Sequence, residues 1–145
     1  MDTLQCAIVL AKLERFEWEV NQRIENGDRY NTLMDGLRVE RVRLAAERTS
    51  MYAQYTVLVE QRERLQELLK NAGIPTAVHY PVPLNEQPAY SKYGSALDTP
   101  ISSAVSKRVM SLPMSADVGE AIDHVASQLS EVLSRLETDV ASAVG

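Results

Sequence analysis

Apolar residues recur at helical spacing near both ends of the chain. In the N-terminal part they are separated by steps of four, three, four and four residues, at Val9, Leu13, Phe16, Val20 and Ile24. This spacing predicts an amphipathic helix that continues through Tyr30 and Leu33 to Leu37, with Gly27 as its weak point. A similar stripe predicts a C-terminal helix that starts near residues 115–117 and carries Ile122, Val125, Leu129, Val132, Leu133 and Leu136.

The middle of the chain alternates between strand-like and helical patterns. Residues 51–59 (MYAQYTVLV) are rich in β-branched and aromatic side chains and predict a strand, and residues 74–80 (IPTAVHY) predict a second one. Between them, Leu65, Leu68 and Leu69 share one face of a predicted helix, and Gly73 stands where a helix C-cap belongs. A helix around residues 102–108 and a short apolar strand at 109–114 (VMSLPM) are predicted further on.

Two segments lack a regular pattern. Residues 38–50 are polar and contain several arginines, which predicts a loop or an irregular edge segment. Residues 81–100 contain Pro, Gly and Ser and predict a long loop, and such loops in compact domains are usually functional. The order of the elements predicts an α/β (α+β) fold with helices against one face of a small sheet.

Composition narrows the class of protein. The 145 residues fit one domain with a core of its own, and a net charge of −5 argues against binding to nucleic acid or to an anionic membrane. The longest apolar run, residues 6–11, is too short to span a bilayer, and no basic segment of a signal peptide precedes it. The single cysteine excludes an internal disulfide and a cysteine-based zinc site. We therefore expect a cytoplasmic protein without a membrane or nucleic-acid partner.

The residues that are most informative about function lie where the second predicted strand meets the long loop. His79 and Tyr80 end this strand, and Pro81 and Pro83 hold the following chain extended. In a regular strand, the side chains of His79 and Tyr80 would point to opposite faces. The end of a strand before a rigid loop is a common place for ligand contacts. A histidine there is, on residue type alone, more often a polar residue satisfied within the fold.

Other aromatic and basic residues allow two interpretations each. Tyr90 and Tyr93 flank Lys92 on the long loop, either as exposed aromatics or as a lid over a polar ligand. A phosphate site is one interpretation of the arginines in the polar segment, and a solvated surface beside glutamates is the stronger one; these arginines are Arg38, Arg41, Arg43 and Arg48.

The remaining candidates point away from metal binding and from the common hydrolytic sites. His124 has no cysteine or second histidine at ligand spacing, so we expect no metal site. Cys6 lies on an apolar helical stretch and is interpreted as a small core residue. The sequence contains no Ser-His-Asp set, phosphate-binding loop or dinucleotide-binding motif.

Several segments together resemble one protein family: MDTLQCAIVLAKLERF, RYNTLM, YAQYTVLV, LKNAGIPTAVHYPVPLNEQPAY and VMSLPMSADV. They are similar, in order, to the C-terminal part of sugar-nucleotide aminotransferases of the DegT/DnrJ/StrS type. These are pyridoxal-phosphate (PLP) enzymes with the aspartate-aminotransferase fold. The chain most resembles bacterial members that aminate a 3-keto UDP-sugar for surface polysaccharide. The resemblance implies a small, mainly antiparallel sheet packed against helices.

The resemblance also divides the chain. It implies a long connecting helix over residues 1–37 and a small C-terminal domain over residues 38–145, without the family's large domain, which carries the PLP-binding lysine. The lysines of this chain all lie outside the family's lysine motif; they are Lys12, Lys70, Lys92 and Lys107. The complete enzyme would use PLP to transfer an amino group, usually from glutamate, to a keto-sugar nucleotide. We expect this chain alone to bind no cofactor and to be inactive.

In the family, the His-Tyr pair and the proline-rich loop after it touch the sugar-nucleotide substrate. The resemblance therefore assigns substrate contacts to His79 and Tyr80, with Gln87 and Tyr90 as further candidates, and it assigns no catalytic or cofactor-binding residue. Asn85 stands where many members have a second histidine. The family's first helix packs against the large domain and the partner subunit, which implies a homodimer or larger assembly. The alternatives are a non-catalytic interaction module or one half of a split enzyme.

Overall fold

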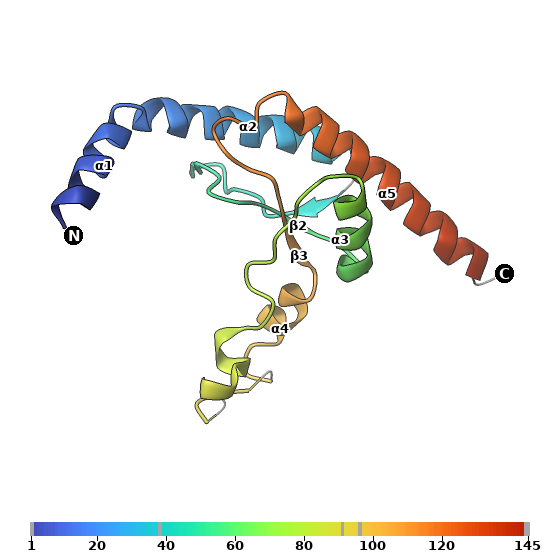
Figure 1. The fold of residues 1–145 in the computed structure, drawn as a ribbon. Helices are drawn as coiled ribbons and strands as arrows, with labels where there is room; N and C mark the ends of the chain where they lie inside the picture. Colours follow the sequence, from blue (N-terminus) through green and yellow to red (C-terminus); the bar gives the residue numbers. More distant parts are fainter. Residues whose placement is uncertain (1, 38, 91, 96, 144–145) are drawn as a thin grey trace.

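The computed structural model describes residues 2–37, 39–90, 92–95 and 97–143. Figure 1 shows helices α2 and α5 above the strands, and helix α4 with two 3-10 turns below them. The elements are, in order, α1 (Thr3–Leu13), α2 (Phe16–Leu37), β1 (Glu40–Arg41), β2 (Tyr55–Leu58), α3 (Arg62–Asn71), η1 (Leu84–Glu86), η2 (Pro88–Tyr90), α4 (Pro100–Ser106), β3 (Val109–Leu112) and α5 (Ala121–Ala143).

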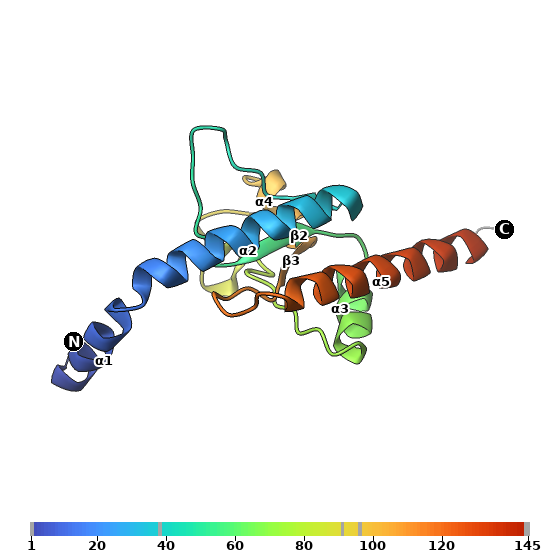
Figure 2. The ribbon, with the colours of Figure 1, turned by 90° about the horizontal axis from the view of Figure 1, so that it is seen from above.

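The sheet has three antiparallel strands in the order β1-β2-β3. The central strand β2 pairs with β3 from Tyr55 opposite Leu112 to Leu58 opposite Val109. Seen from above, α2 and α5 lie over β2 and β3, and α3 lies next to α5 (Figure 2). The predicted fold, a small antiparallel sheet with helices on one face, is confirmed.

The core lies between the sheet and helices α2, α3 and α5. Its fully buried side chains come from all of these elements: Tyr30, Met34, Val57, Leu65, Leu69, Met110, Ile122 and Leu129. The predicted stripe of the C-terminal helix is confirmed, although α5 begins at Ala121 and not near residues 115–117. Burying one such side chain contributes roughly 1.5–3 kcal/mol, so this helical cover supplies most of the apolar stabilisation.

Gly73 ends α3, as predicted. It has a φ of +81°, and its N–H donates to the Lys70 carbonyl at 3.0 Å while the Ile74 N–H donates to the Leu69 carbonyl at 2.8 Å. This is the hydrogen-bond pattern of a Schellman cap, in which glycine adopts the left-handed conformation without strain. The cap turns the chain back so that the residues after it reach β3.

The N-terminal helix is interrupted at Glu14 and Arg15, so the prediction of a weak point at Gly27 is wrong. Neither Glu14 nor Arg15 is a helix breaker, which is why the sequence pattern does not reveal the interruption. Gly27 is buried within α2, and the ring of Tyr52 lies against it. An ideal Cβ at position 27 would be 2.1 Å from Tyr52 Cδ2. Glycine therefore permits a close approach here and does not weaken the helix.

Both predicted central strands differ from the structure. The first is shorter than predicted: β2 begins only at Tyr55, because Tyr52 has a φ of 45°, far from extended geometry. The second prediction, a strand at residues 74–80, is wrong. Only Ala77 pairs with β3, through two backbone hydrogen bonds to Ser111 of 3.1 and 2.7 Å. Pro75 and Pro81 have no N–H to donate, which limits further pairing.

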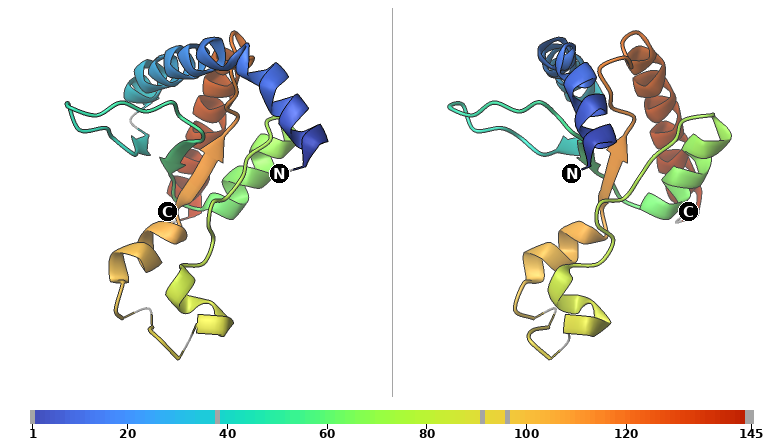
Figure 3. Two further views of the ribbon diagram at one scale, coloured as in Figure 1. Left: turned by 90° about the vertical axis from the view of Figure 1, so that its left-hand side faces the viewer. Right: turned by 60° about the vertical axis from the view of Figure 1, so that its left-hand side comes forward.

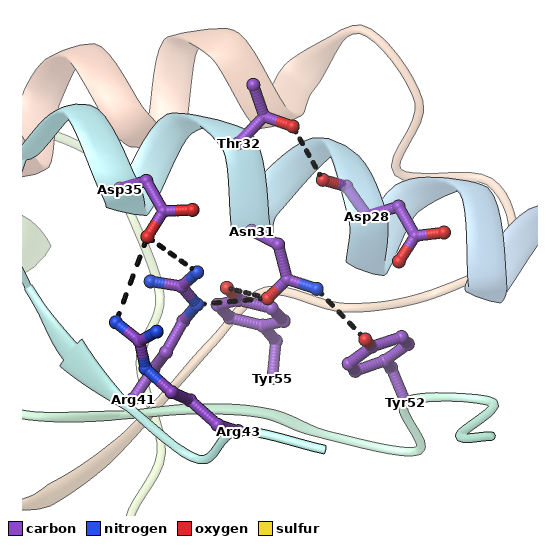
Figure 4. Close-up of polar contacts among 8 residues, drawn as sticks. All are labelled: Asp28, Asn31, Thr32, Asp35, Arg41, Arg43, Tyr52 and Tyr55. Carbon is purple, nitrogen blue, oxygen red and sulfur yellow. Dashed lines mark hydrogen bonds and ion pairs between the residues drawn. The ribbon is translucent and has the colours of Figure 1, made fainter. Parts of the chain in front are cut away.

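Asn31 on α2 holds the segment between β1 and β2 in place (Figure 4). Its carbonyl oxygen accepts hydrogen bonds from Arg41 Nε at 3.1 Å and the Tyr55 hydroxyl at 2.9 Å, and its amide donates to the Tyr52 hydroxyl at 2.9 Å. Asp35 forms an ion pair with Arg41 at 2.9 Å. Burial raises the pKa of Tyr55 far above the ordinary value, so its hydroxyl remains protonated and keeps donating.

The first helix is largely uncovered in this chain. No residue of α1 is buried, so the predicted core role of Cys6 is wrong. Large apolar side chains are exposed along α1 and the start of α2, at Leu4, Ile8, Val9, Leu10, Leu13, Phe16 and Trp18. Within the described residues, no helix has both the length and the apolar content needed to cross a membrane.

Replacing Gly27 by alanine tests the packing of α2 on Tyr52. The added methyl would overlap the Tyr52 ring, and such overpacking costs about 1–3 kcal/mol, whereas alanine gains only about 1 kcal/mol over glycine in a helix. We expect Gly27→Ala to lower the free energy of unfolding measured in urea.

Gly36→Ala is the matched control on the same helix. Nothing lies within 4 Å of a Cβ added there, so this variant should gain about 0.5–1 kcal/mol. Equal stabilisation by both substitutions would contradict the close contact between Gly27 and Tyr52.

Candidate functional site

The stretch from residue 81 to residue 106 projects from the sheet as an arm (Figure 3). The predicted loop is irregular in the arm's described part apart from η1 and η2, which precede α4. Asn85 Nδ2 donates to the Ser95 carbonyl at 2.7 Å and to Thr99 Oγ1 at 3.0 Å. The Ser103 hydroxyl donates to the Glu86 carboxylate. These bonds join η1 to the returning half of the arm, so Asn85 has a structural role within the arm.

Arg62 at the start of α3 attaches the base of the arm to the domain. Its side chain is only 10% exposed, and Nη1 donates to the carbonyl oxygens of Ser106 at 2.5 Å and Val109 at 3.4 Å. Its Nη2 pairs with the Glu63 carboxylate at 2.9 Å. A charged donor on two main-chain carbonyls fixes the point where α4 leads into β3.

A groove of about 650 Å³ lies between the arm and β3, and we call it the arm groove. Of the four predicted site residues, His79, Tyr80 and Gln87 line it, whereas Tyr90 lies outside it on η2. The other lining residues are Val82, Pro83, Leu84, Asn85, Ser102, Val105, Ser106 and Val109.

The regular strand in which His79 and Tyr80 would face opposite ways does not form, since only Ala77 of residues 74–80 pairs with β3. Both side chains line the arm groove, with ring centroids 6.0 Å apart in an edge-to-face arrangement. Tyr80 is 76% exposed, so little of its side chain is used for folding. The pair is therefore free to meet a ligand from one direction.

A second groove of about 400 Å³ adjoins the first, and we call it the sheet groove. His79 lines both grooves. The sheet groove is otherwise lined by Ala53, Gln54, Pro75, Thr76, Ala77, Ser111, Leu112, Pro113 and Met114. Sequence reasoning missed Gln54 and Ser111. Strand alternation contained the signal for Gln54, since it lies two residues before Thr56, on the face opposite buried Tyr55 and Val57.

The polar groups of the sheet groove differ in how far they are already paired. Thr56 Oγ1 and Ser111 Oγ lie 3.2 Å apart across the strands, and Gln66 Nε2 donates to Thr76 Oγ1 at 3.0 Å. Within the described part of the chain, no hydrogen bond uses the side-chain amide of Gln54. This amide therefore has its donors and its acceptor available to a ligand.

The two grooves carry little charge. None of the side chains that line them is Asp, Glu, Lys or Arg. Imidazole, phenol, amide and hydroxyl groups provide the polar contacts, and aliphatic side chains provide the rest. Such walls suit a neutral, hydroxyl-rich ligand, and they can bind and orient it but do not supply an activated nucleophile.

The other sequence candidates lie away from the grooves. Lys92 Nζ lies 4.8 Å from the centroid of the Tyr93 ring, and Tyr93 is 75% exposed and lines neither groove. His124 is exposed on α5. Among the described residues, no group of three His, Cys, Asp or Glu side chains could hold a metal ion.

The described arginines of this segment differ: Arg43 and Arg48 lie on the exposed surface, whereas the Arg41 side chain is only 9% exposed, which the interpretation as a solvated surface did not predict. Arg41 and Arg43 pair with Asp35, at 2.9 and 4.0 Å, as Figure 4 shows. Arg48 lies 3.8 Å from Glu47. Arg38 falls outside the described residues.

Two curated relatives carry sugar-nucleotide names. The chain is 44% identical over 114 residues to a UDP-2-acetamido-2-deoxy-3-oxo-D-glucuronate aminotransferase from Pseudomonas aeruginosa, with 79% of this chain and 31% of the relative covered. It is 30% identical over 115 residues to a dTDP-3-amino-3,6-dideoxy-alpha-D-galactopyranose transaminase from Aneurinibacillus thermoaerophilus, with 79% and 31% covered. The chain thus spans about a third of the length of these relatives.

The fold also matches a solved structure. A DegT DnrJ EryC1 StrS aminotransferase from Brucella abortus superposes with a TM-score of 0.81 at 34% identity, covering 89% of this chain and 35% of that one. Residues 1–130 match the sequence pattern of the DegT/DnrJ/EryC1/StrS aminotransferase family. With the pattern covering most of the chain and the fold in agreement, the chain belongs to this family.

Proposed function

We propose that this chain is the C-terminal, substrate-orienting part of a PLP-dependent aminotransferase. The complete enzyme transfers an amino group from glutamate to a keto-sugar nucleotide that is used for surface polysaccharide. The observation that carries this proposal is the arm groove, where His79, Tyr80 and Gln87 meet in a chain of this family. The relative from Pseudomonas aeruginosa, by its name, acts on a 3-oxo UDP-sugar, which supports the same substrate class here.

The proposal assigns two roles along the chain. Residues 1–37 connect to a large domain, and residues 38–145 form the small domain. The exposed apolar side chains of α1 support a connecting role, since side chains such as Leu4, Ile8 and Leu10 need cover from another part of the protein. The second half of α2 packs against the small domain through Tyr30 and Met34 and thereby fixes the direction of the connection.

The grooves of this chain do not fit PLP as a resident group. The internal bond to PLP needs a lysine amine, and no lysine lines either groove. The neutral walls also offer no cation for a phosphate. The lysine and the phosphate contacts are therefore assigned to the large domain, and this chain contributes substrate contacts only.

Within the arm groove, each polar side chain can form hydrogen bonds with the substrate. The Tyr80 hydroxyl and the Gln87 amide both donate and accept, which suits the hydroxyl groups of a sugar. The His79 imidazole can also donate and accept through its two ring nitrogens. Leu84, Val105 and Val109 provide an apolar wall for the sugar's C–H surface. Together these contacts hold the keto-sugar in one orientation.

Replacing His79 tests the assignment. In the complete aminotransferase, we expect His79→Ala to lower kcat/KM for the sugar nucleotide by about two- to tenfold, the loss of one net hydrogen bond to a sugar hydroxyl. The free energy of unfolding should change by less than about 1 kcal/mol, since the side chain is exposed. Steady-state kinetics and urea denaturation measure the two effects.

His124→Ala is the matched control, because this second histidine is exposed on α5 and lines neither groove. It should leave both quantities unchanged. A large loss of stability in His79→Ala with unchanged kinetics would instead assign His79 a role in folding.

We also propose that the chain associates into a homodimer or larger assembly through α1 and the start of α2. Phe16 is 52% exposed within this apolar stretch, and burial of such a side chain is worth roughly 1.5–3 kcal/mol. We expect Phe16→Glu to shift the purified chain toward monomer in light scattering, because the substitution places a charge in the contact.

Val42→Glu is the control for surface charge alone, since Val42 is 63% exposed on the segment between β1 and β2. It should leave the molar mass unchanged. A monodisperse monomer of the unmodified chain at tens of micromolar would contradict association through this helix.

A further inference from the structure

The sheet groove has a chemical character that the proposed function leaves unassigned. It combines one available amide, from Gln54, with an apolar wall made of Ala53, Pro75, Leu112, Pro113 and Met114. A hydroxyl-only ligand would leave this apolar wall without a partner. The groove therefore suits a small group that is polar at one end and apolar at the other.

The backbone before Gln54 is held firmly enough for specific recognition. Arg23 Nη1 donates to the carbonyl oxygens of Tyr52 and Ala53, at 3.4 and 3.5 Å. On the other side, Tyr55 is buried and its hydroxyl bonds to Asn31. These anchors fix the backbone position from which the Gln54 side chain reaches the sheet groove.

His79 joins this groove to the proposed sugar site. Because His79 lines both grooves, the sheet groove is the neighbouring space into which a ring substituent of a sugar in the arm groove could extend. The lining contains no Asp, Glu, Lys or Arg, so a charged substituent would be desolvated there without an opposite charge. A neutral substituent with its own donor and acceptor is the better match.

We propose that the sheet groove binds the acetamido group of an N-acetylated sugar nucleotide, with Gln54 as the specificity-determining residue. The acetamido N–H and C=O pair with the carbonyl and amide of Gln54, and the methyl group packs on Pro75 and Met114. This inference rests on the proposed function, because it requires a sugar in the arm groove. The acetamido group in the name of the relative from Pseudomonas aeruginosa supports this substituent.

The test compares two sugar nucleotides that differ only at the second ring carbon. UDP-N-acetylglucosamine carries an acetamido group there, and UDP-glucose carries a hydroxyl. Each is titrated into the ¹⁵N-labelled chain, and dissociation constants are taken from amide chemical shifts. We expect UDP-N-acetylglucosamine to bind about two- to tenfold more tightly, the effect of one net hydrogen bond. Its titration should also shift the side-chain amide signals of Gln54.

Gln54→Leu keeps most of the side-chain volume and removes the amide. We expect it to bind both nucleotides with equal affinity, at the UDP-glucose value of the unmodified chain. Gln22→Leu is the matched control: Gln22 donates to Glu25 on α2 and lines neither groove, and the preference should persist.

The possible results distinguish a failure of the acetamido subsite from a failure of the proposed function. If both nucleotides bind but the preference is absent, or survives in Gln54→Leu, the acetamido subsite is wrong and the proposed function stands. If neither nucleotide shifts the signals of His79, Tyr80 or Gln87 at millimolar concentration, the proposed function itself is overturned, and the subsite with it. Unfolding in urea and the dispersion of the amide spectrum check that Gln54→Leu retains the native fold.

Discussion

The stacking of Tyr30 on Tyr55 joins α2 to the central strand, and the rest of the domain depends on this contact. The two rings lie 4.6 Å apart at 25°, and both side chains are buried. A buried hydroxyl without a partner would be costly, and here the Tyr30 hydroxyl donates to the Pro113 carbonyl at 2.9 Å. One residue of α2 thereby positions both β2 and the chain that leaves β3 toward α5.

The same packing explains why the candidate site lies where it does. Helices α2 and α5 cover one face of the sheet, so the residues that alternate toward the other face are left for contacts outside the core. Gln54 precedes β2, Ser111 lies on β3, and His79 follows the single bridge between Ala77 and Ser111. The two grooves adjoin because these three positions lie on neighbouring segments. The site is thus a consequence of sheet geometry combined with one arm.

Sequence patterns predicted the parts of the fold that rest on local chemistry. The stripe of α5 and the glycine after α3 are of this kind, because spacing and a positive φ are encoded within a few residues. Residues 74–80 have a strand-like composition, but pairing requires free N–H groups at the right places, and the prolines remove them. At Gly27 the sequence pattern was misleading. Glycine allows the ring of Tyr52, which is distant in sequence, to pack directly against the helix. His79, Tyr80 and Gln87 were proposed from a family motif, and the structure brings the three residues to one groove. Gln54 required knowing which face of β2 the helices leave open.

The bridge between Ala77 and Ser111 closes the base of the arm, so the arm is a structurally separate unit. The two backbone hydrogen bonds of this bridge, at 3.1 and 2.7 Å, and the bonds from Arg62 to the Ser106 and Val109 carbonyls hold the base of the arm at the sheet. Loop length adds little to the cost of closure. A shorter, longer or chemically different arm could be exchanged between these two points while the register of β2 with β3 and the core stay the same. Such a design lets ligand preference diverge among related chains at little cost to the stability of the domain that carries it.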